Sequence, residues 1–121
     1  MPGSPTDPFD KVRAAASGLP DVTEGTAWRV PALKVRGRMF ACMASHRSAE
    51  PGTLVVRLDY VDRDWLIASD PRVYYLQPHY LNHPCALVRL RHITRAKLRE
   101  LLRISRDYAA PRRATHARGR G

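Results

Sequence analysis

The strand-forming runs in the first half of this chain are joined by connections that are short enough to favour antiparallel pairing. Residues 22–45 read as strands, interrupted by Pro31 and divided by a predicted hairpin turn at Arg36-Gly37-Arg38. A polar loop follows at residues 46–52, and the β-branched residues 53–58 predict another strand. Because a parallel neighbour needs a crossover of about a dozen residues or more, these short connections favour an antiparallel sheet.

Two helices are predicted near the ends of the chain. Asp7 is a suitable helix N-cap and Pro8 suits the first helical position, so a helix is expected over about residues 8–17. Thr94 caps the other helix, and Pro111 stops it. The apolar stripe of the first helix consists of Phe9, Val12, Ala16 and Leu19. The stripe of the other helix consists of Leu98, Leu101, Leu102, Ser105 and Tyr108.

The segment between them supplies a further helix and two short strands. Asp59 can cap this helix, and Asp70-Pro71 ends it. Short strands at residues 73–76 and 86–90 flank an irregular stretch that is rich in aromatic residues and histidine. The side chains of the middle helix that we expect to face the core are Trp65 and Leu66, with Tyr60 or Val61 one turn earlier.

Together these elements predict an α+β fold in two layers, with an antiparallel sheet of five to six strands and three helices on one of its faces. A length of 121 residues suits a single domain, which we place at residues 8–110. Residues 1–7 are expected to form a flexible leader. Residues 111–121 are expected to form a disordered basic tail, because they contain almost no apolar bulk.

Positive charge is concentrated late in the chain. Residues 1–88 carry 10 Lys or Arg against 9 Asp or Glu, a net of +1, whereas residues 89–121 carry 11 against 2, a net of +9. This asymmetry suggests a polyanionic partner, above all nucleic acid, although the charge can also serve only solubility. The residues expected to contact phosphates are Arg95, Lys97, Arg99, Arg103 and Arg106 on one face of the last helix, and Arg112 and Arg113 in the tail.

The sequence makes no positive case for catalysis. No G-x-S-x-G segment surrounds a serine, and no glycine-rich phosphate loop is present. The densest set of possible metal ligands is His79, His83 and Cys85, but its spacing fits no standard zinc motif. We therefore expect structural or surface histidines in a non-enzymatic protein that uses no cofactor and no metal.

The cysteines and the hydropathy pattern indicate the compartment. Cys42 and Cys85 form no close-spaced motif, which suggests a reducing compartment and two small core residues. The chain shows neither a signal-peptide pattern nor a run of about 20 apolar residues. We expect a cytoplasmic protein that does not enter a membrane and is a monomer or a weak dimer.

Two blocks of sequence resemble the MmcQ/YjbR family. The first is Trp28-Arg29-Val30-Pro31-Ala32-Leu33-Lys34-Val35 with Gly37 and Phe40, and the second is Tyr74-Tyr75-Leu76-Gln77-Pro78-His79-Tyr80. Leu33 stands where the family usually has Phe, and Arg38 where it usually has Lys. The resemblance implies a curved antiparallel sheet in a secretion-chaperone-like arrangement. It also implies no catalytic residues, and family members are commonly labelled DNA-binding by analogy of fold.

Three hypotheses for function follow. The leading one is a nucleic-acid (DNA) binding protein, directed mostly to phosphates through the basic last helix. The alternatives are a protein-interaction domain and a small-molecule or peptide-binding module with a possible anionic ligand fixed by Lys34 or His79. A flat basic face would support the first hypothesis, and a concave aromatic pocket would support the last. The family's recurrent positions that would line such a pocket are Trp28, Lys34, Tyr75, His79 and Tyr80.

Overall fold

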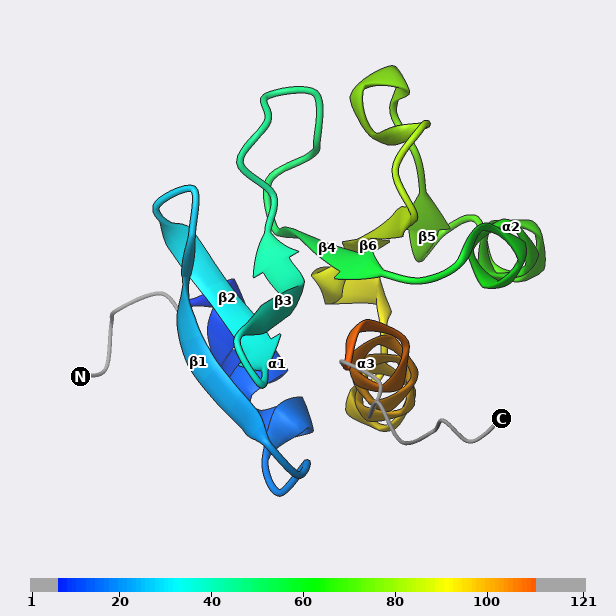
Figure 1. The fold of residues 1–121 in the computed structure, drawn as a ribbon. Coiled ribbons are helices and arrows are strands. Elements are labelled where there is room, and N and C mark those ends of the chain that lie inside the picture. Colours follow the sequence, from blue (N-terminus) through cyan, green and yellow to red (C-terminus); the bar gives the residue numbers. More distant parts are fainter. Residues whose placement is uncertain (1–6, 111–121) are drawn as a thin grey trace.

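The computed structural model describes residues 7–110, which form an α+β fold of three α-helices and one six-stranded antiparallel sheet (Figure 1). The predicted fold class is thereby confirmed. The predicted leader apart from Asp7, and the predicted tail with Arg112 and Arg113, lie outside the described residues. The elements in chain order are α1 (Pro8–Ala16), β1 (Val22–Ala27), β2 (Val30–Val35), β3 (Arg38–Met43), β4 (Thr53–Arg57), α2 (Tyr60–Ser69), β5 (Tyr74–Tyr75), β6 (Cys85–Arg89) and α3 (Arg95–Ala109), with 3₁₀ turns at Pro78–Tyr80 and Leu90–His92.

The sheet follows the order β1-β2-β3-β4-β6-β5, and every neighbouring pair is antiparallel. The predicted turn between β2 and β3 is confirmed, because Arg36 and Gly37 have φ of 49° and 84°. Two consecutive positive φ angles give the tight turn whose twist matches that of the flanking strands. One register shift, between Leu33 and Lys34, interrupts the pairing of β2 with β3.

Local capping chemistry begins all three helices where the sequence predicts. Asp7 accepts a hydrogen bond from Phe9 N–H at 3.0 Å. Asp59 accepts one from Asp62 N–H at 2.9 Å, and Thr94 accepts one from Lys97 N–H at 3.2 Å. Each cap satisfies an N–H group that the first helical turn leaves without a partner.

The main core lies between the sheet and the two terminal helices. α1 and α3 pack together on one side of the sheet, which curves around them (Figure 1). Phe9 and Val12 from α1 are fully buried in the same cluster as Leu98 and Leu102 from α3. The stripe predicted for α3 is wrong at its end, because Tyr108 is 42% exposed.

Side-chain hydrogen bonds also join α1 to α3 and to the turn that precedes α3. The Arg99 guanidinium donates to the carbonyls of Ala15 at 2.9 Å and Ser17 at 2.6 Å, at the C-terminus of α1. Lys11 reaches the opposite way, to the carbonyls of Leu90 at 2.6 Å and Ile93 at 2.5 Å. These bonds satisfy carbonyl groups that helix ends and turns leave free, so α1 and α3 are joined by more than apolar contact.

The orientation predicted for α2 is wrong for Trp65 and right for Leu66. Trp65 is 67% exposed and Val61 is 77% exposed, so neither faces the core, whereas the partly buried Leu66 packs against the main core cluster. The one residue of α2 that is buried is Arg63. α2 lies beside β5 and β6 (Figure 1), where Leu66 and Ile67 pack against the main core and Arg63 meets polar backbone.

Three connections project to the side of the sheet away from α3. They are the turn between β1 and β2, the loop between β3 and β4, and the segment between β5 and β6 (Figure 1). Residues of these three connections line a cavity over the central strands, on the face of the sheet that α1 and α3 do not cover. The candidate functional site lies there.

Candidate functional site

The floor of the site comes from alternation along the central strands. Leu54 and Val56 of β4 enter the main core, whereas Val55 belongs to a second buried cluster that also holds Cys42 and Cys85. Successive residues of a strand point to opposite faces, so this second cluster is the other side of the same sheet. It underlies a groove with a cavity volume of about 920 Å³.

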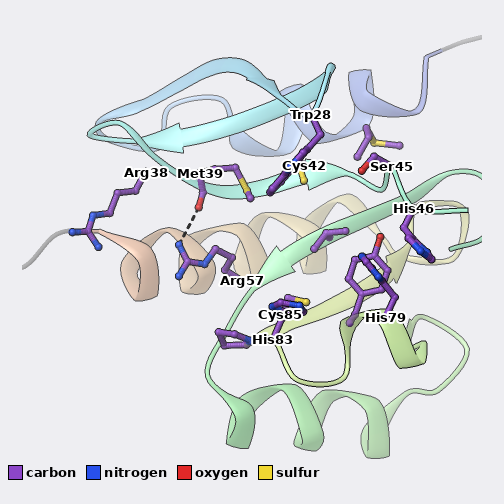
Figure 2. Close-up of a pocket in the computed structure, with 14 residues that line it drawn as sticks. Trp28, Arg38, Met39, Cys42, Ser45, His46, Arg57, His79, His83 and Cys85 are labelled. Atoms are coloured by element: carbon purple, nitrogen blue, oxygen red, sulfur yellow. Dashed lines mark hydrogen bonds between the residues drawn. The ribbon is translucent and has the colours of Figure 1, made fainter. Parts of the chain in front are cut away.

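Aromatic and imidazole side chains form the walls of this groove. Trp28, at the tip of the β1–β2 hairpin, lines one wall and is 70% exposed. His46 and His79, from the two other projecting segments, stack with ring centroids 3.6 Å apart and planes within 10° of each other. The Tyr80 ring meets the His79 ring edge-on at 4.8 Å. Figure 2 shows Arg38 and Arg57 towards one side of the groove and the stacked histidines towards the other.

The charged residues that line the groove are arginines, and no carboxylate is among its lining residues within the described part of the chain. Arg57 donates to the Met39 carbonyl at 3.4 Å (Figure 2) and lies over the Tyr108 ring at 5.8 Å, and neither partner carries a charge. Arg38 is exposed at the start of β3. The groove therefore offers two positive charges without a negative counterpart in its lining.

Most of the carboxylates in residues 7–110 pair with arginines that do not line the groove. Glu24 pairs with Arg13 at 2.8 Å, and Glu50 pairs with Arg89 at 2.8 Å. Each of these arginines holds the pKa of its glutamate below the ordinary value. Further ion pairs join Asp21 to Arg36, Asp64 to Arg63, and Glu100 and Asp107 to Arg103.

The stacked histidines favour the neutral imidazole at His46. Burial lowers the pKa of His46, and the neighbouring His79 and Arg47 lower it further. Ser48 N–H donates to His46 Nδ1 at 3.1 Å, so this nitrogen is used as an acceptor. A proton on Nδ1 would remove that bond and place a charge against the His79 ring.

The thiols in the floor are reduced and poorly nucleophilic. Cys42 and Cys85 are both free and buried. Burial raises the pKa of Cys42 to about 11, and it also raises the pKa of Cys85. Because the thiolate is the reactive form, these sulfurs act as soft apolar surface at neutral pH. The sequence-based prediction of two small core cysteines is confirmed.

Arg63 of α2 holds the wall that carries the histidines. Its Nη1 donates to the Leu81 carbonyl at 2.8 Å and to the His83 carbonyl at 3.4 Å. Tyr60, one turn earlier on α2, donates its hydroxyl to the Asn82 carbonyl at 2.8 Å. The helix thus fixes the backbone of residues 81–83, which directly follow Tyr80.

A second network holds the β3–β4 loop that carries His46. The Tyr75 hydroxyl bonds to Thr53 Oγ1 at 2.6 Å and accepts from Glu50 N–H at 2.9 Å. The Arg89 guanidinium lies over the Tyr75 ring, 4.1 Å from its centroid, and pairs with Glu50. Tyr75 therefore packs under the loop and does not line the groove.

The structure brings together three of the five residues that the sequence predicts for a pocket. Trp28, His79 and Tyr80 do line one groove. Tyr75 is outside it for the reason just given. Lys34 is outside it as well, because its chain lies across Gly25 of the neighbouring strand, where a Cβ on that glycine would be 3.4 Å from Lys34 Cε.

Sequence reasoning missed the arginines and one of the histidines. Arg57 shares the face of Val55 by strand alternation in residues 53–58, so the period-two pattern contained its position. Arg38 was assigned to the predicted turn but is the first residue of β3, and the face of the sheet on which its side chain lies depends on the strand register. His46 lay in a loop for which no pattern predicts a partner.

The basic row predicted on α3 is largely engaged within the protein. Arg99 binds the end of α1, and Arg106 donates to the Pro20 carbonyl at 2.7 Å. Arg103 pairs with Glu100 and Asp107. Arg95 and Lys97 are exposed, and their side chains make no hydrogen bond or ion pair with any other residue in 7–110. Their contact with phosphates stays a prediction.

Among residues 7–110, no three His, Cys, Asp or Glu side chains come together in a way that could hold a metal ion. The helices within this range are also too short or too polar to cross a membrane.

Comparisons with known proteins agree with the fold. The family model described as YjbR matches residues 17–108. The crystal structure of Deinococcus radiodurans protein DR2400, with family-model domain DUF419, is similar at a TM-score of 0.62 and 23% identity. That alignment covers 82% of this chain and 78% of the other. No curated protein matches the sequence.

Proposed function

We propose that this chain, which belongs to the YjbR family, is a non-enzymatic protein that binds a small anionic ligand with an apolar body. The observation that carries the proposal is the composition of the groove. It combines an apolar floor with Arg38 and Arg57 and has no carboxylate in its lining within residues 7–110. A concave site of this kind distinguishes ligand binding from contact with a flat basic face.

The physical basis is charge complementarity at a site of suitable size. A cavity of about 920 Å³ is in the range that accommodates a drug-sized molecule. Arginine presents a planar set of donors that matches a carboxylate or a phosphate, and Arg57 keeps that set without a competing acid. Apolar floor residues such as Val55 would cover the rest of the ligand.

The same residues support binding without catalysis. A nucleophile needs an adjacent base or a lowered pKa, and the groove thiols have raised pKa values. Histidine is the commonest general acid or base, but no hydrogen bond within residues 7–110 joins the ring of His46, His79 or His83 to a hydroxyl or thiol of the groove lining. A ligand held here would be bound and released unchanged.

The proposal is tested by titrating the full chain with two simple probes, undecanoate and naphthoate, followed by amide NMR. We expect the amide signals of Cys42, Val55 and Cys85 to shift with at least one probe. Arg57→Met should weaken that binding by about tenfold or more, the effect of losing one charge-assisted hydrogen bond. Arg36→Met is the matched control, since Arg36 pairs with Asp21 outside the groove. If neither probe shifts the groove signals, the proposal is wrong.

A second candidate function is phosphate-directed binding of nucleic acid, which the net charge of +9 over residues 89–121 favours. Fluorescence anisotropy with a random-sequence DNA duplex at several salt concentrations tests it on the full chain. We expect affinity to fall steeply with salt, and to weaken in the double variant Arg95→Ala, Lys97→Ala. The matched control is Arg29→Ala with Arg72→Ala, two exposed arginines outside the basic segment. Affinity that does not change with salt would exclude this second function.

A further inference from the structure

Trp28 occupies an unusual backbone position for an aromatic residue. The turn between β1 and β2 consists of Trp28 and Arg29, whose φ angles are 50° and 67°. Asn-Gly and Gly-Gly are the residues that such a turn prefers, because a Cβ is disfavoured at positive φ. The corresponding turn between β2 and β3 does contain a glycine, Gly37. The chain thus holds a tryptophan where a smaller residue would be less strained.

Burial of the indole does little to offset the strain of this backbone conformation. Trp28 is 70% exposed and does not belong to the second buried cluster, although the adjacent Ala27 packs against that cluster. It nevertheless lines the groove, on the wall opposite His83 and Cys85 (Figure 2). Backbone strain concentrates at functional positions, and an exposed, strained aromatic residue at the edge of a groove indicates contact with a ligand.

The remaining surfaces of the groove suit a flat ring better than a flexible alkyl chain. The floor holds the thiols of Cys42 and Cys85 and the thioether of Met39, and polarisable sulfur makes favourable contacts with aromatic rings. The other wall presents the stacked imidazoles of His46 and His79. A planar ligand can therefore meet π-faces or sulfur on several sides.

We infer that the ligand is a planar aromatic anion, whose ring lies along the indole of Trp28 while its charged group meets Arg38 and Arg57. The inference rests on the proposed function and adds the chemical class of the ligand. Trp28 would be the residue that selects a ring over an alkyl chain. Arg38 and Arg57 would bind either kind of anion.

The test compares naphthoate with undecanoate, which carry one carboxylate each and similar numbers of carbon atoms. It uses the full chain with Trp65→Phe, so that Trp28 is the only indole. We expect naphthoate to bind more tightly than undecanoate and to quench the Trp28 fluorescence. The variant Trp28→Leu keeps apolar bulk without a ring and should lose about tenfold in naphthoate affinity, measured by calorimetry, with undecanoate affinity unchanged. Trp28→Phe should restore most of the loss.

The outcomes separate this inference from the proposed function. Equal binding of both probes that depends on Arg57 but not on Trp28 would overturn the aromatic preference and leave the proposed function standing. Loss of affinity for both probes in Trp28→Leu but not in Trp28→Phe would overturn the selective role, because the ring would then serve any ligand. Absence of binding by either probe would overturn both.

Discussion

Trp28 combines an exposed indole with a positive φ angle, and the two properties together make stability and binding separable at this residue. A left-handed conformation costs a residue with a Cβ about 1–2 kcal/mol, and Asn tolerates it better. We expect Trp28→Asn to raise the free energy of unfolding by about 0.5–1 kcal/mol in urea titrations. The same variant should lose affinity for naphthoate.

The control for this prediction is the adjacent residue. Arg29→Gly relieves the second positive φ of the turn and leaves the indole in place. It should stabilise the protein without loss of binding. A fall in stability of Trp28→Asn by more than about 1 kcal/mol would mean that the indole packs against the fold, and the argument from strain would fail.

His46 makes the stability of the fold depend on pH near neutrality. Its pKa in the folded protein is lowered, first by burial and then by His79 and Arg47, so the folded state favours the neutral ring. The resulting stability is fully present above the unfolded pKa of about 6.5 and is lost as the pH falls through the lower folded value. We expect the free energy of unfolding to decrease between pH 7 and pH 5.

The matched variant for the pH prediction is His46→Asn. An Asn side chain keeps an oxygen acceptor for Ser48 N–H but does not titrate. Its unfolding free energy should change less over the same pH interval than that of the unmodified chain. An equal loss in both proteins would assign the pH dependence to other groups.

At the scale of elements, α2 acts as a clamp on the segment that carries His79 and His83. Arg63 is buried and bonds to two carbonyls of that segment. We expect Arg63→Met to destabilise the protein by about 1.5–3 kcal/mol, because two part-buried hydrogen bonds from a charged donor are lost. Amide hydrogen exchange at residues 79–83 should accelerate in this variant.

The neighbouring residue gives a control for this prediction. Asp64 pairs with Arg63 but is 67% exposed, so Asp64→Asn should change stability by only about 0.5 kcal/mol or less. If Arg63→Met left both stability and exchange unchanged, the segment would be held by its other contacts, such as the Tyr60 hydroxyl.

Helix boundaries could be predicted from the sequence because nearby residues determine them, whereas the buried face of a helix depends on residues far away in the sequence. The caps Asp7, Asp59 and Thr94 act within three residues, and each was identified from sequence. The face of α2 depends on what lies beneath it, and there the carbonyls at the end of the β5–β6 segment bind Arg63. A pattern of apolar residues contains no signal for a buried arginine, so Trp65 was assigned to the core wrongly.

The candidate site was predictable only where one segment determines it. Trp28, His79 and Tyr80 lie in the two blocks that resemble the YjbR family, and they line the groove. The stacking of His46 on His79 joins loops separated by 33 positions in the numbering, and only the completed sheet brings them together. The charge count of the sequence also overestimated how many basic side chains are free to bind a partner, because Arg99 is used within the protein to bind the end of α1.

At the scale of the whole molecule, stability depends on contact between the first and the last helix. α1 and α3 share one core cluster, Arg99 of α3 bonds to carbonyls at the end of α1, and Lys11 of α1 bonds to the turn that precedes α3. We expect a chain ending at His92, which lacks α3, to show no cooperative unfolding transition in urea. A chain ending at Ala110 is the control and should unfold cooperatively. A cooperative transition in the shorter chain would show that α3 is dispensable for the core.

The pairing of α1 with α3 has a consequence for synthesis. α1 leaves the ribosome before α3, yet Phe9 and Val12 are buried in the same cluster as Leu98 and Leu102 of α3. Domains whose contacts span the sequence complete their folding late, and their nascent apolar segments remain exposed meanwhile. We therefore expect this domain to reach its native state only after α3 has been synthesised and has left the ribosome. Nascent chains stalled within α3 should be cut by protease, whereas the released protein should resist.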